Sequence, residues 1–323
     1  MRWFLGPLLL LLLVVGSICA PPVQVTPPPA DAPAAEVALT GASVLIGTGD
    51  IGNCGNQGNL GAKATAKLMD SVLRADSAAK VHDEAFTLGD NAYPGGSEQD
   101  FAQCFATTWG DSSKLIMKNI RPSIGNHEHL SGMAAPYYKY FGSHAGPSDK
   151  GYYSYNVGEW HAIVLNSEIV VNASFSDAER KAQEDWLAQD LKSNHQVCML
   201  AYWHHPRFSS GWHGTDARLA PIWRILYDGG VDLVLNGHDH DYERFLPQTP
   251  DGVVDTTKGI PEIVVGTGGG DLRGFRSVIA PNSAYRVQGH YGVLKLTLGA
   301  KAYRRAFLGV TGSIWDRGGA ACH

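Results

Sequence analysis

Five short segments of the sequence end in side chains that can bind a metal ion. The segments "GTGD", "LGD", "SIGNH", "YWHH" and "NGHDH" supply Asp50, Asp90, Asn126, His127, His204, His205, His238 and His240. Carboxylate oxygens and imidazole nitrogens are common ligands of first-row transition metals. A single Gly-Asp is usually a turn, and a single buried histidine is usually a core residue. Five such segments together favour a metal site.

The spacing inside two of these segments adds to this prediction. His238 and His240 are two residues apart, so on an extended chain both side chains point to the same side. A glycine precedes most of the candidate ligands and lets the backbone approach closely, because it has no Cβ atom. Tyr93 follows Asp90 by three residues and offers a phenol oxygen as a further ligand. The alternative for Tyr93 is an ordinary tyrosine in the turn "AYPGG".

The elements that must position these residues alternate between strands and helices. We expect strands in 43–50, 84–90 and 115–126, a helix from Leu60 to Ala75, two strands in 151–167 that turn at Gly158-Glu159, a capped helix from Ser176 to about Asn194, and strands in 196–206, 231–240, 260–270, 291–299 and 302–310. This order predicts an α/β sandwich with mixed sheets. Ligands of open α/β sheets collect beyond the carboxyl ends of the strands, where the five segments end.

The first 37 residues do not resemble the rest of the chain. Arg2, the apolar run from Phe4 to Val15 and the small residues of "GSICA" predict a secretory signal peptide over residues 1–20. The alternatives to an ordinary cleaved signal are a short uncleaved membrane anchor and a lipoprotein signal that is lipidated at Cys19. Residues 21–37 are rich in proline and alanine and predict an extended linker. We therefore expect the catalytic domain to cover residues 38–323, with no stable membrane insertion after the signal is removed.

Cysteine content and charge also bear on the location and the partners. Outside the signal, the even number of cysteines, namely Cys54, Cys104, Cys198 and Cys322, suits an oxidising compartment. Three pairings are possible; we favour Cys54 with Cys104 and Cys198 with Cys322, because the first two each follow a motif aspartate. Four free thiols are the alternative. The net charge of −5 provides no basic surface for nucleic acid, and no oligomeric state is predicted.

The motifs together resemble a known family. The order Asp50, Gly89-Asp90-x-x-Tyr93, Gly125-Asn126-His127-Glu128, His204, Gly237-His238-x-His240 is similar to that of the calcineurin-like metallophosphoesterases, and specifically of the purple acid phosphatase branch. The likeness extends from about Ala38 to Leu308. It implies a four-layer α/β/β/α sandwich with two mixed β-sheets and two metal ions at the strand ends.

The resemblance also implies a ligand set. One ion would be held by Asp50, Asp90, Tyr93 and His240, and the other by Asp90, Asn126, His204 and His238, with Asp90 bridging. The broader family usually begins with Asp-x-His, whereas this chain has Gly52 in place of that histidine. Tyr93 would fill the vacant position, and a phenolate is a hard anionic donor. We therefore expect Fe(III) at the first site and a divalent ion, Fe, Zn or Mn, at the second.

The function implied by this site is an exported phosphatase that hydrolyses small phosphate monoesters by attack of metal-bound hydroxide. A phosphodiesterase with the same metal site is one alternative, and a non-catalytic binding module is another. The resemblance places His127 beside the phosphate. His213 would face the leaving group as a general acid, unless it is a surface loop residue.

Several other residues near the motifs have less specific expectations. His205 should point away from the metal ligands and pack in the core. Arg207 and Arg244 could bind phosphate oxygens, but we expect structural ion pairs. The stretch "GTGGGD" lacks the last glycine of a nucleotide-binding loop, so we expect a glycine-rich loop that borders the site.

Overall fold

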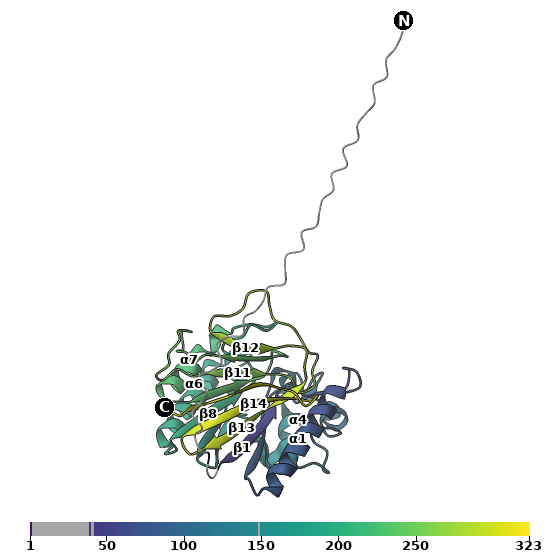
Figure 1. The fold of residues 1–323 in the computed structure, drawn as a ribbon, viewed down its shortest axis with the longest axis horizontal. Coiled ribbons are helices and arrows are strands. Elements are labelled where there is room, and N and C mark those ends of the chain that lie inside the picture. Colours follow the sequence, from purple (N-terminus) through teal and green to yellow (C-terminus); the bar gives the residue numbers. More distant parts are fainter. Residues whose placement is uncertain (2–38, 40–41, 148) are drawn as a thin grey trace.

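The computed structural model describes Met1, Leu39 and residues 42–147 and 149–323 (Figure 1). Apart from Met1, the expected signal peptide over residues 1–20, with Cys19, lies outside the described residues, as does the expected linker over 21–37. No helix in the described part of the chain has the length and the apolar character that a membrane span requires.

Two large mixed sheets form the centre of the domain. The six-stranded sheet has the order β15-β14-β13-β1-β3-β5, with bounds Ile314–Ala321, Ala302–Gly309, Gly292–Gly299, Ser43–Thr48, Asp83–Leu88 and Ile120–Ser123. The seven-stranded sheet has the order β12-β10-β11-β9-β8-β7-β6, with bounds Ser283–Val287, Tyr242–Phe245, Glu262–Val265, Leu233–Asn236, Cys198–Trp203, Trp160–Val164 and Tyr153–Val157. In the first, β1 pairs in parallel with β3 and antiparallel with β13. In the second, β8 is parallel to both neighbours, whereas β10 and β11 are antiparallel.

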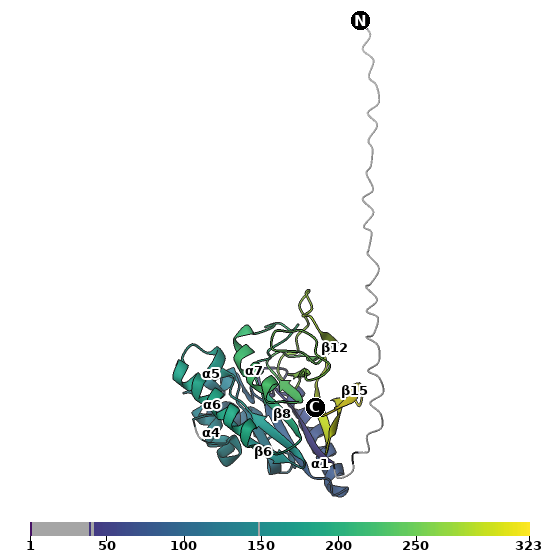
Figure 2. The same ribbon diagram turned by 90° about the vertical axis from the view of Figure 1, so that its left-hand side faces the viewer.

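Helices cover both outer faces of the paired sheets. Helices α1 (Leu60–Ala78) and α4 (Ala135–Phe141) pack with the six-stranded sheet around one apolar core, and α6 (Asp177–Ser193) and α7 (Ala220–Asp228) pack with the seven-stranded sheet around another. A third core fills the space between the sheets. Figure 1 shows the two helix pairs on opposite sides of the strands, and Figure 2 shows β15 on the side away from α5 (Glu168–Val171), α6 and α7. The predicted four-layer α/β/β/α sandwich is confirmed.

Most of the predicted elements are present, with bounds close to those expected. Helix α6 begins with the predicted capping box: Ser176 Oγ accepts a hydrogen bond from the Glu179 N–H at 3.3 Å, and Glu179 Oε2 accepts one from the Ser176 N–H at 2.7 Å. Strands β6 and β7 turn at Gly158, whose φ is +59°. Helices α4, α5 and α7 and strands β10, β12 and β15 were not predicted. The remaining short elements are the strands β2 (Gly52–Asn53) and β4 (Ala92–Tyr93) and the helices α2 (Glu98–Asp100) and α3 (Asn126–His129). The described part of the chain also contains a short π-helix, η1 (Phe101–Phe105), and three short 3-10 helices, η2 (Ile116–Asn119), η3 (Gly142–Ala145) and η4 (Ala217–Leu219).

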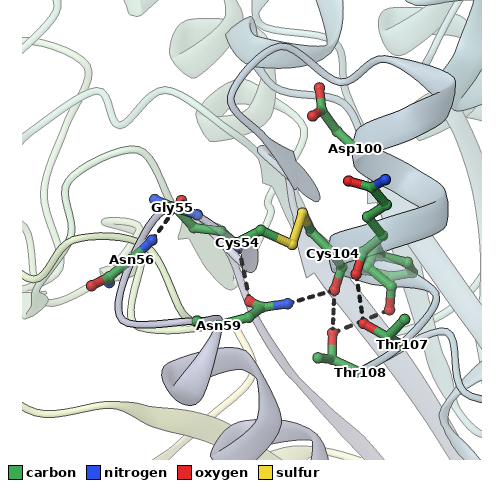
Figure 3. The surroundings of a disulfide bond; sticks show 12 residues. Cys54, Gly55, Asn56, Asn59, Asp100, Cys104, Thr107 and Thr108 are labelled. Atoms are coloured by element: carbon green, nitrogen blue, oxygen red, sulfur yellow. Dashed lines mark hydrogen bonds between the residues drawn. A yellow bond between two sulfur atoms is a disulfide. The ribbon is translucent and has the colours of Figure 1, made fainter.

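Both favoured disulfides are present. Cys198 opens β8 of the seven-stranded sheet and is bonded to Cys322, which follows β15 of the six-stranded sheet, so this bond links the two sheets. Cys54 is bonded to Cys104 in η1 (Figure 3). Beside it, Asn59 Nδ2 donates a hydrogen bond to the Cys104 carbonyl at 2.7 Å. This second disulfide ties the segment after β2 to the segment after β4.

A buried charge cluster joins the two sheets. Asp316 of β15 accepts hydrogen bonds from Tyr242 Oη at 2.8 Å, Arg244 Nε at 2.8 Å and Arg305 Nε at 3.2 Å. Tyr242 and Arg244 belong to β10 of the opposite sheet. Burial alone would raise the pKa of Asp316, but the charge of Arg305 and the hydrogen bond and charge of Arg244 lower it overall. Arg244 is thus a structural ion-pair partner, as expected.

We predict that Asp316→Ala lowers the free energy of unfolding by about 3–5 kcal/mol, because the substitution removes the buried carboxylate that both Arg244 and Arg305 bind. Urea denaturation with intact disulfides measures the change. Since the pKa of Asp316 is lowered, its contribution is present above the unfolded-state pKa of about 3.9 and is lost as the pH falls below that value.

The matched control is Glu98→Ala, which removes an exposed ion pair with Lys139. It should cost less than about 1 kcal/mol. Equal stabilities for the two variants would contradict the structural role of Asp316.

Candidate metal centre

The carboxyl ends of strands from both sheets meet at one edge of the sandwich. Asp50, Asp90 and Asn126 follow β1, β3 and β5, which are neighbours in the six-stranded sheet. His204 and His238 follow β8 and β9, which are neighbours in the seven-stranded sheet. The candidate ligands therefore face one another across the gap between the sheets.

Close backbone approach at this edge explains the glycines beside the ligands. A Cβ atom added to Gly125 would lie 2.2 Å from Asp90 Oδ1, and one added to Gly89 would lie 2.6 Å from His204 Nδ1. The backbone itself is strained here, because Asp50, Asp90 and His238 have φ values of +60°, +49° and +70°. Such left-handed conformations cost energy for residues other than glycine and are concentrated at functional sites.

The first predicted ligand group is brought together around the Tyr93 hydroxyl. Tyr93 Oη lies 2.8 Å from Asp50 Oδ1, 3.0 Å from Asp90 Oδ2 and 3.1 Å from His240 Nε2. The segments carrying Asp50 and Tyr93 are paired just beyond the aspartates, where β2 and β4 form a short parallel ladder. Tyr93 is 5% exposed, so it is not the surface turn tyrosine of the alternative interpretation.

The second predicted ligand group is brought together around His204. His204 Nε2 lies 3.0 Å from Asn126 Oδ1, 3.1 Å from His238 Nδ1 and 3.3 Å from Asp90 Oδ2. Asp90 Oδ2 thus contacts a member of each group. Its position is the one that a bridging ligand requires.

In four candidate ligands, the side-chain atom that faces away from the cluster is hydrogen-bonded to the backbone. The Asp50 Oδ2 and Asp90 Oδ1 atoms accept hydrogen bonds from the N–H groups of His238 at 2.8 Å and His127 at 2.9 Å. His204 Nδ1 and His240 Nδ1 each lie 2.7 Å from a carbonyl oxygen, to which they donate. When neutral, both rings would therefore direct their Nε2 lone pairs into the cluster, as histidine ligands of metals require.

Glu128 fastens the segments that carry Asp90 and Asn126. Its buried carboxylate accepts hydrogen bonds from the N–H groups of Gly125 at 2.7 Å, Asn91 at 2.7 Å, Asp90 at 3.0 Å and Ala92 at 3.3 Å. Burial and the charge of Asp90 raise the pKa of Glu128, while these N–H groups oppose the rise. Glu128 belongs to the motif "GNHE", but this role was not predicted from the sequence.

The electrostatics of the cluster fit a bound cation. Asp50 and Asp90 are buried, and their ion-pair partners are the imidazoles of His240, His204 and His127. Burial would raise the pKa of Asp90, but the charge of His204 lowers it overall. Burial and then the two carboxylates raise the pKa of Tyr93 well above its ordinary value. Buried carboxylates need a paired cation or a metal ion, and the donors present here suit a metal ion.

His127 and His213 both lie against the cluster. His127 Nε2 is 3.7 Å from Asp90 Oδ2, and its ring lies 4.4 Å from that of Tyr93. The His213 ring stacks on that of His238 with centroids 4.0 Å apart. His213 is therefore part of the site, and not a distant loop residue.

Asp239 positions the loop that carries His213. This role of Asp239 was not predicted from the sequence. Asp239 is fully buried, and its Oδ1 atom accepts hydrogen bonds from the N–H of His213 at 2.8 Å and from His213 Nδ1 at 3.0 Å. Its Oδ2 atom accepts one from Ser209 Oγ at 2.5 Å. The signal in the sequence was the acidic residue between two candidate ligands in "HDH".

The glycine-rich loop borders the site, as predicted, and adds an arginine that was not predicted. The N–H of Gly270 donates to the Asp50 carbonyl at 2.8 Å, and the N–H of Arg273 donates to the His240 carbonyl at 3.1 Å. The Arg273 Nη1 atom lies 3.3 Å from His213 Nε2. Arg273 thus places a cationic side chain beside His213.

His205 and Arg207, which follow the candidate ligand His204, differ in part from what the sequence predicted. His205 was expected to point away from the ligands, and this is wrong: a ring nitrogen of His205 lies within 4.8 Å of ring nitrogens of His204 and His238. Strand β8 ends at Trp203, so the alternation of side chains no longer holds at 204–205. Arg207 makes a structural contact, but with a carbonyl group in place of the expected ion-pair partner: its Nη2 donates to the Pro250 carbonyl at 3.1 Å.

Comparison with known proteins agrees with the motifs. The family model described as calcineurin-like phosphoesterase matches residues 44–242. Purple acid phosphatase 15 of Arabidopsis thaliana is 35% identical over 156 residues, which are 42% of this chain and 27% of that protein. Acid phosphatase type 7 of Homo sapiens is 26% identical over 258 residues, which are 69% of this chain and 57% of that protein.

A solved structure shares the fold. The purple acid phosphatase PPD1 from yellow lupin (Lupinus luteus) seeds superposes with a TM-score of 0.70 at 18% sequence identity. The match covers 87% of this chain and 54% of that chain. In each of these three comparisons the match covers less than two thirds of the other protein's length.

Proposed function

Because the chain belongs to the calcineurin-like phosphoesterase family, we propose that it is an exported metal-dependent phosphatase that hydrolyses phosphate monoesters. The observation that carries the proposal is that five strand ends of two sheets bring the candidate ligands together around Asp90, whose Oδ2 atom contacts Tyr93 in one group and His204 in the other. Relatives of this chain are named purple acid phosphatase and acid phosphatase, which supports the same reaction class.

The family implies two metal ions, and the two ligand groups divide between them. Asp50, Tyr93 and His240 would hold the first ion, and Asn126, His204 and His238 would hold the second. Asp90 would serve both. When bound, two such ions would polarise the phosphoryl oxygens and lower the pKa of the attacking water.

We assign Fe(III) to the first ion on the basis of Tyr93. Burial and the neighbouring carboxylates hold the Tyr93 proton firmly in the absence of a cation, so its loss requires a strongly Lewis-acidic ion. A phenolate is a hard anionic oxygen donor and suits a trivalent iron. The second group contains no phenol, and its amide oxygen and imidazole nitrogens suit divalent Fe, Zn or Mn.

The chain's own side chains would complete the reaction. His127, beside Asp90, and Arg273, beside His213, would bind phosphate oxygens. Asp239 accepts a hydrogen bond from His213 Nδ1 and so orients the ring with Nε2 toward Arg273 and the cluster. With a second proton on Nε2, His213 would donate that proton to the departing alkoxide as a general acid.

Export is supported by the two disulfides, because such bonds persist in oxidising compartments. The apolar run and small residues at the start of the sequence support the same location.

The substrate class can be tested with two esters of the same alcohol. We predict that metal-loaded protein hydrolyses para-nitrophenyl phosphate with a kcat/KM at least about tenfold above that for the bis(para-nitrophenyl) ester, because a monoester presents more anionic oxygens to the metal ions and Arg273. Treatment with a chelator should abolish the activity. A preference for the diester would indicate a phosphodiesterase, and inactivity on both esters would refute the catalytic assignment.

The iron assignment depends on Tyr93. We predict that purified wild-type protein loaded with iron has a visible tyrosinate-to-iron charge-transfer band and that Tyr93→Phe loses it while the fold persists. Tyr291→Phe is the matched control, because it removes a hydroxyl that binds Asn56 at the glycine-rich loop and leaves the cluster intact. A band that survives in Tyr93→Phe would exclude this phenolate.

The acid role of His213 predicts a dependence on the leaving group. In His213→Ala, kcat should fall by about 10²-fold for phenyl phosphate, whose leaving group needs a proton. The loss should be much smaller for para-nitrophenyl phosphate. Asp239→Asn should show the same selective loss, since it disturbs the orientation of His213. Equal losses for both esters would contradict the acid role.

A further inference from the structure

A pocket of about 340 Å³ lies beside the candidate metal centre, against His213 and His238. The segment that follows His213 forms another wall, with Thr215, Asp216 and Arg218. Small-molecule sites typically occupy roughly 300–1,000 Å³, so this pocket suits a small ligand or a small part of one. None of the roles assigned above uses this space.

The position of the pocket relates it to the leaving group. His238 belongs to the second ligand group, and the His213 ring stacks directly on it. A phosphate held at the cluster would have its ester oxygen close to the general acid. Since His213 also lines the pocket, the alcohol part of the ester would extend into it.

The walls of the pocket are mostly polar. They comprise three imidazoles, the Thr215 hydroxyl, the Asp216 carboxylate and the Arg218 guanidinium, with Pro206 and Gly214 between them. An aromatic or aliphatic alcohol would bury these groups without providing hydrogen bonds, which is costly. Hydroxyl groups both donate and accept, so they match walls that contain both kinds of partner.

The charges in the pocket are already balanced. Arg218 Nε lies 2.9 Å from Asp216 Oδ1, and Arg218 Nη2 lies 2.5 Å from Asp216 Oδ2. Arg218 Nη1 donates to the Val171 carbonyl at 2.6 Å, which fixes the guanidinium in place. A forked pair of this kind is neutral as a unit. It therefore favours an uncharged ligand over one that carries a second anionic group.

We infer that this pocket is the leaving-group subsite and that it takes an uncharged polyol of about the size of glycerol or a single sugar. The preferred substrates are then polyol or sugar phosphate monoesters. This inference rests on the proposed phosphatase function and adds the substrate class to it.

The test compares KM for glucose 6-phosphate and phenyl phosphate on the metal-loaded full chain. Wild type should have the lower KM for glucose 6-phosphate. The double variant Asp216→Ala/Arg218→Ala should raise that KM about tenfold, through loss of hydrogen bonds to charged groups. The KM for phenyl phosphate should change less than about twofold, because that ester makes no such bonds in the pocket.

The matched control is Arg224→Ala/Asp251→Ala, which removes an exposed Arg–Asp pair close by in sequence, away from the pocket. It should leave both KM values unchanged. If the first double variant does not fold, Thr215→Val tests the same wall, with an expected rise of about threefold for glucose 6-phosphate alone.

Three results would overturn the inference while the phosphatase function stands: a lower wild-type KM for phenyl phosphate, an equal rise of KM for both esters, or no rise for either. A wild type that hydrolyses neither ester would instead overturn the phosphatase function, and this inference with it.

Discussion

The carboxylate of Asp90 is the constraint on which the rest of the site depends. One of its oxygens must accept the His127 N–H while the other faces both ligand groups, and this requires the left-handed backbone at Asp90. Gly125 leaves the room for this carboxylate, since a Cβ atom there would overlap with it. The buried Glu128 carboxylate then accepts hydrogen bonds from the N–H groups of Asp90, Asn91 and Gly125. The short motifs "LGD" and "GNHE" are thus joined by hydrogen bonds around the Asp90 carboxylate.

The two sheets must also keep a fixed relative position, because each supplies part of the ligand set. Direct hydrogen bonds join their ends, such as that from the Gly49 N–H to the Val265 carbonyl at 2.9 Å. Asp316 and the Cys198–Cys322 disulfide join the sheets at other places. The elements outside the site therefore contribute to function by holding two independent sets of strand ends in register.

Much of the fold and the grouping of the candidate ligands could be predicted from the sequence, because most of these residues follow an apolar strand and lie beside a recognisable glycine or histidine. Asp239, Arg273 and Arg218 could not be assigned in this way, since their roles arise from contacts between segments distant in the chain. The wrong orientation of His205 has the same origin: the alternation of side chains holds only inside a strand, and β8 ends at Trp203. Helices α4, α5 and α7 and strands β10, β12 and β15 were missed because their positions depend on packing against elements formed elsewhere.

The central claim is that two metal ions share Asp90 and that the iron lies on the Tyr93 side. Anomalous diffraction from crystals of the metal-loaded protein, recorded on both sides of the iron absorption edge, tests it most directly. Our account predicts two metal peaks on either side of Asp90 Oδ2, with an iron peak beside Tyr93 and His240. A single peak, or an iron-free peak beside Tyr93, would contradict it.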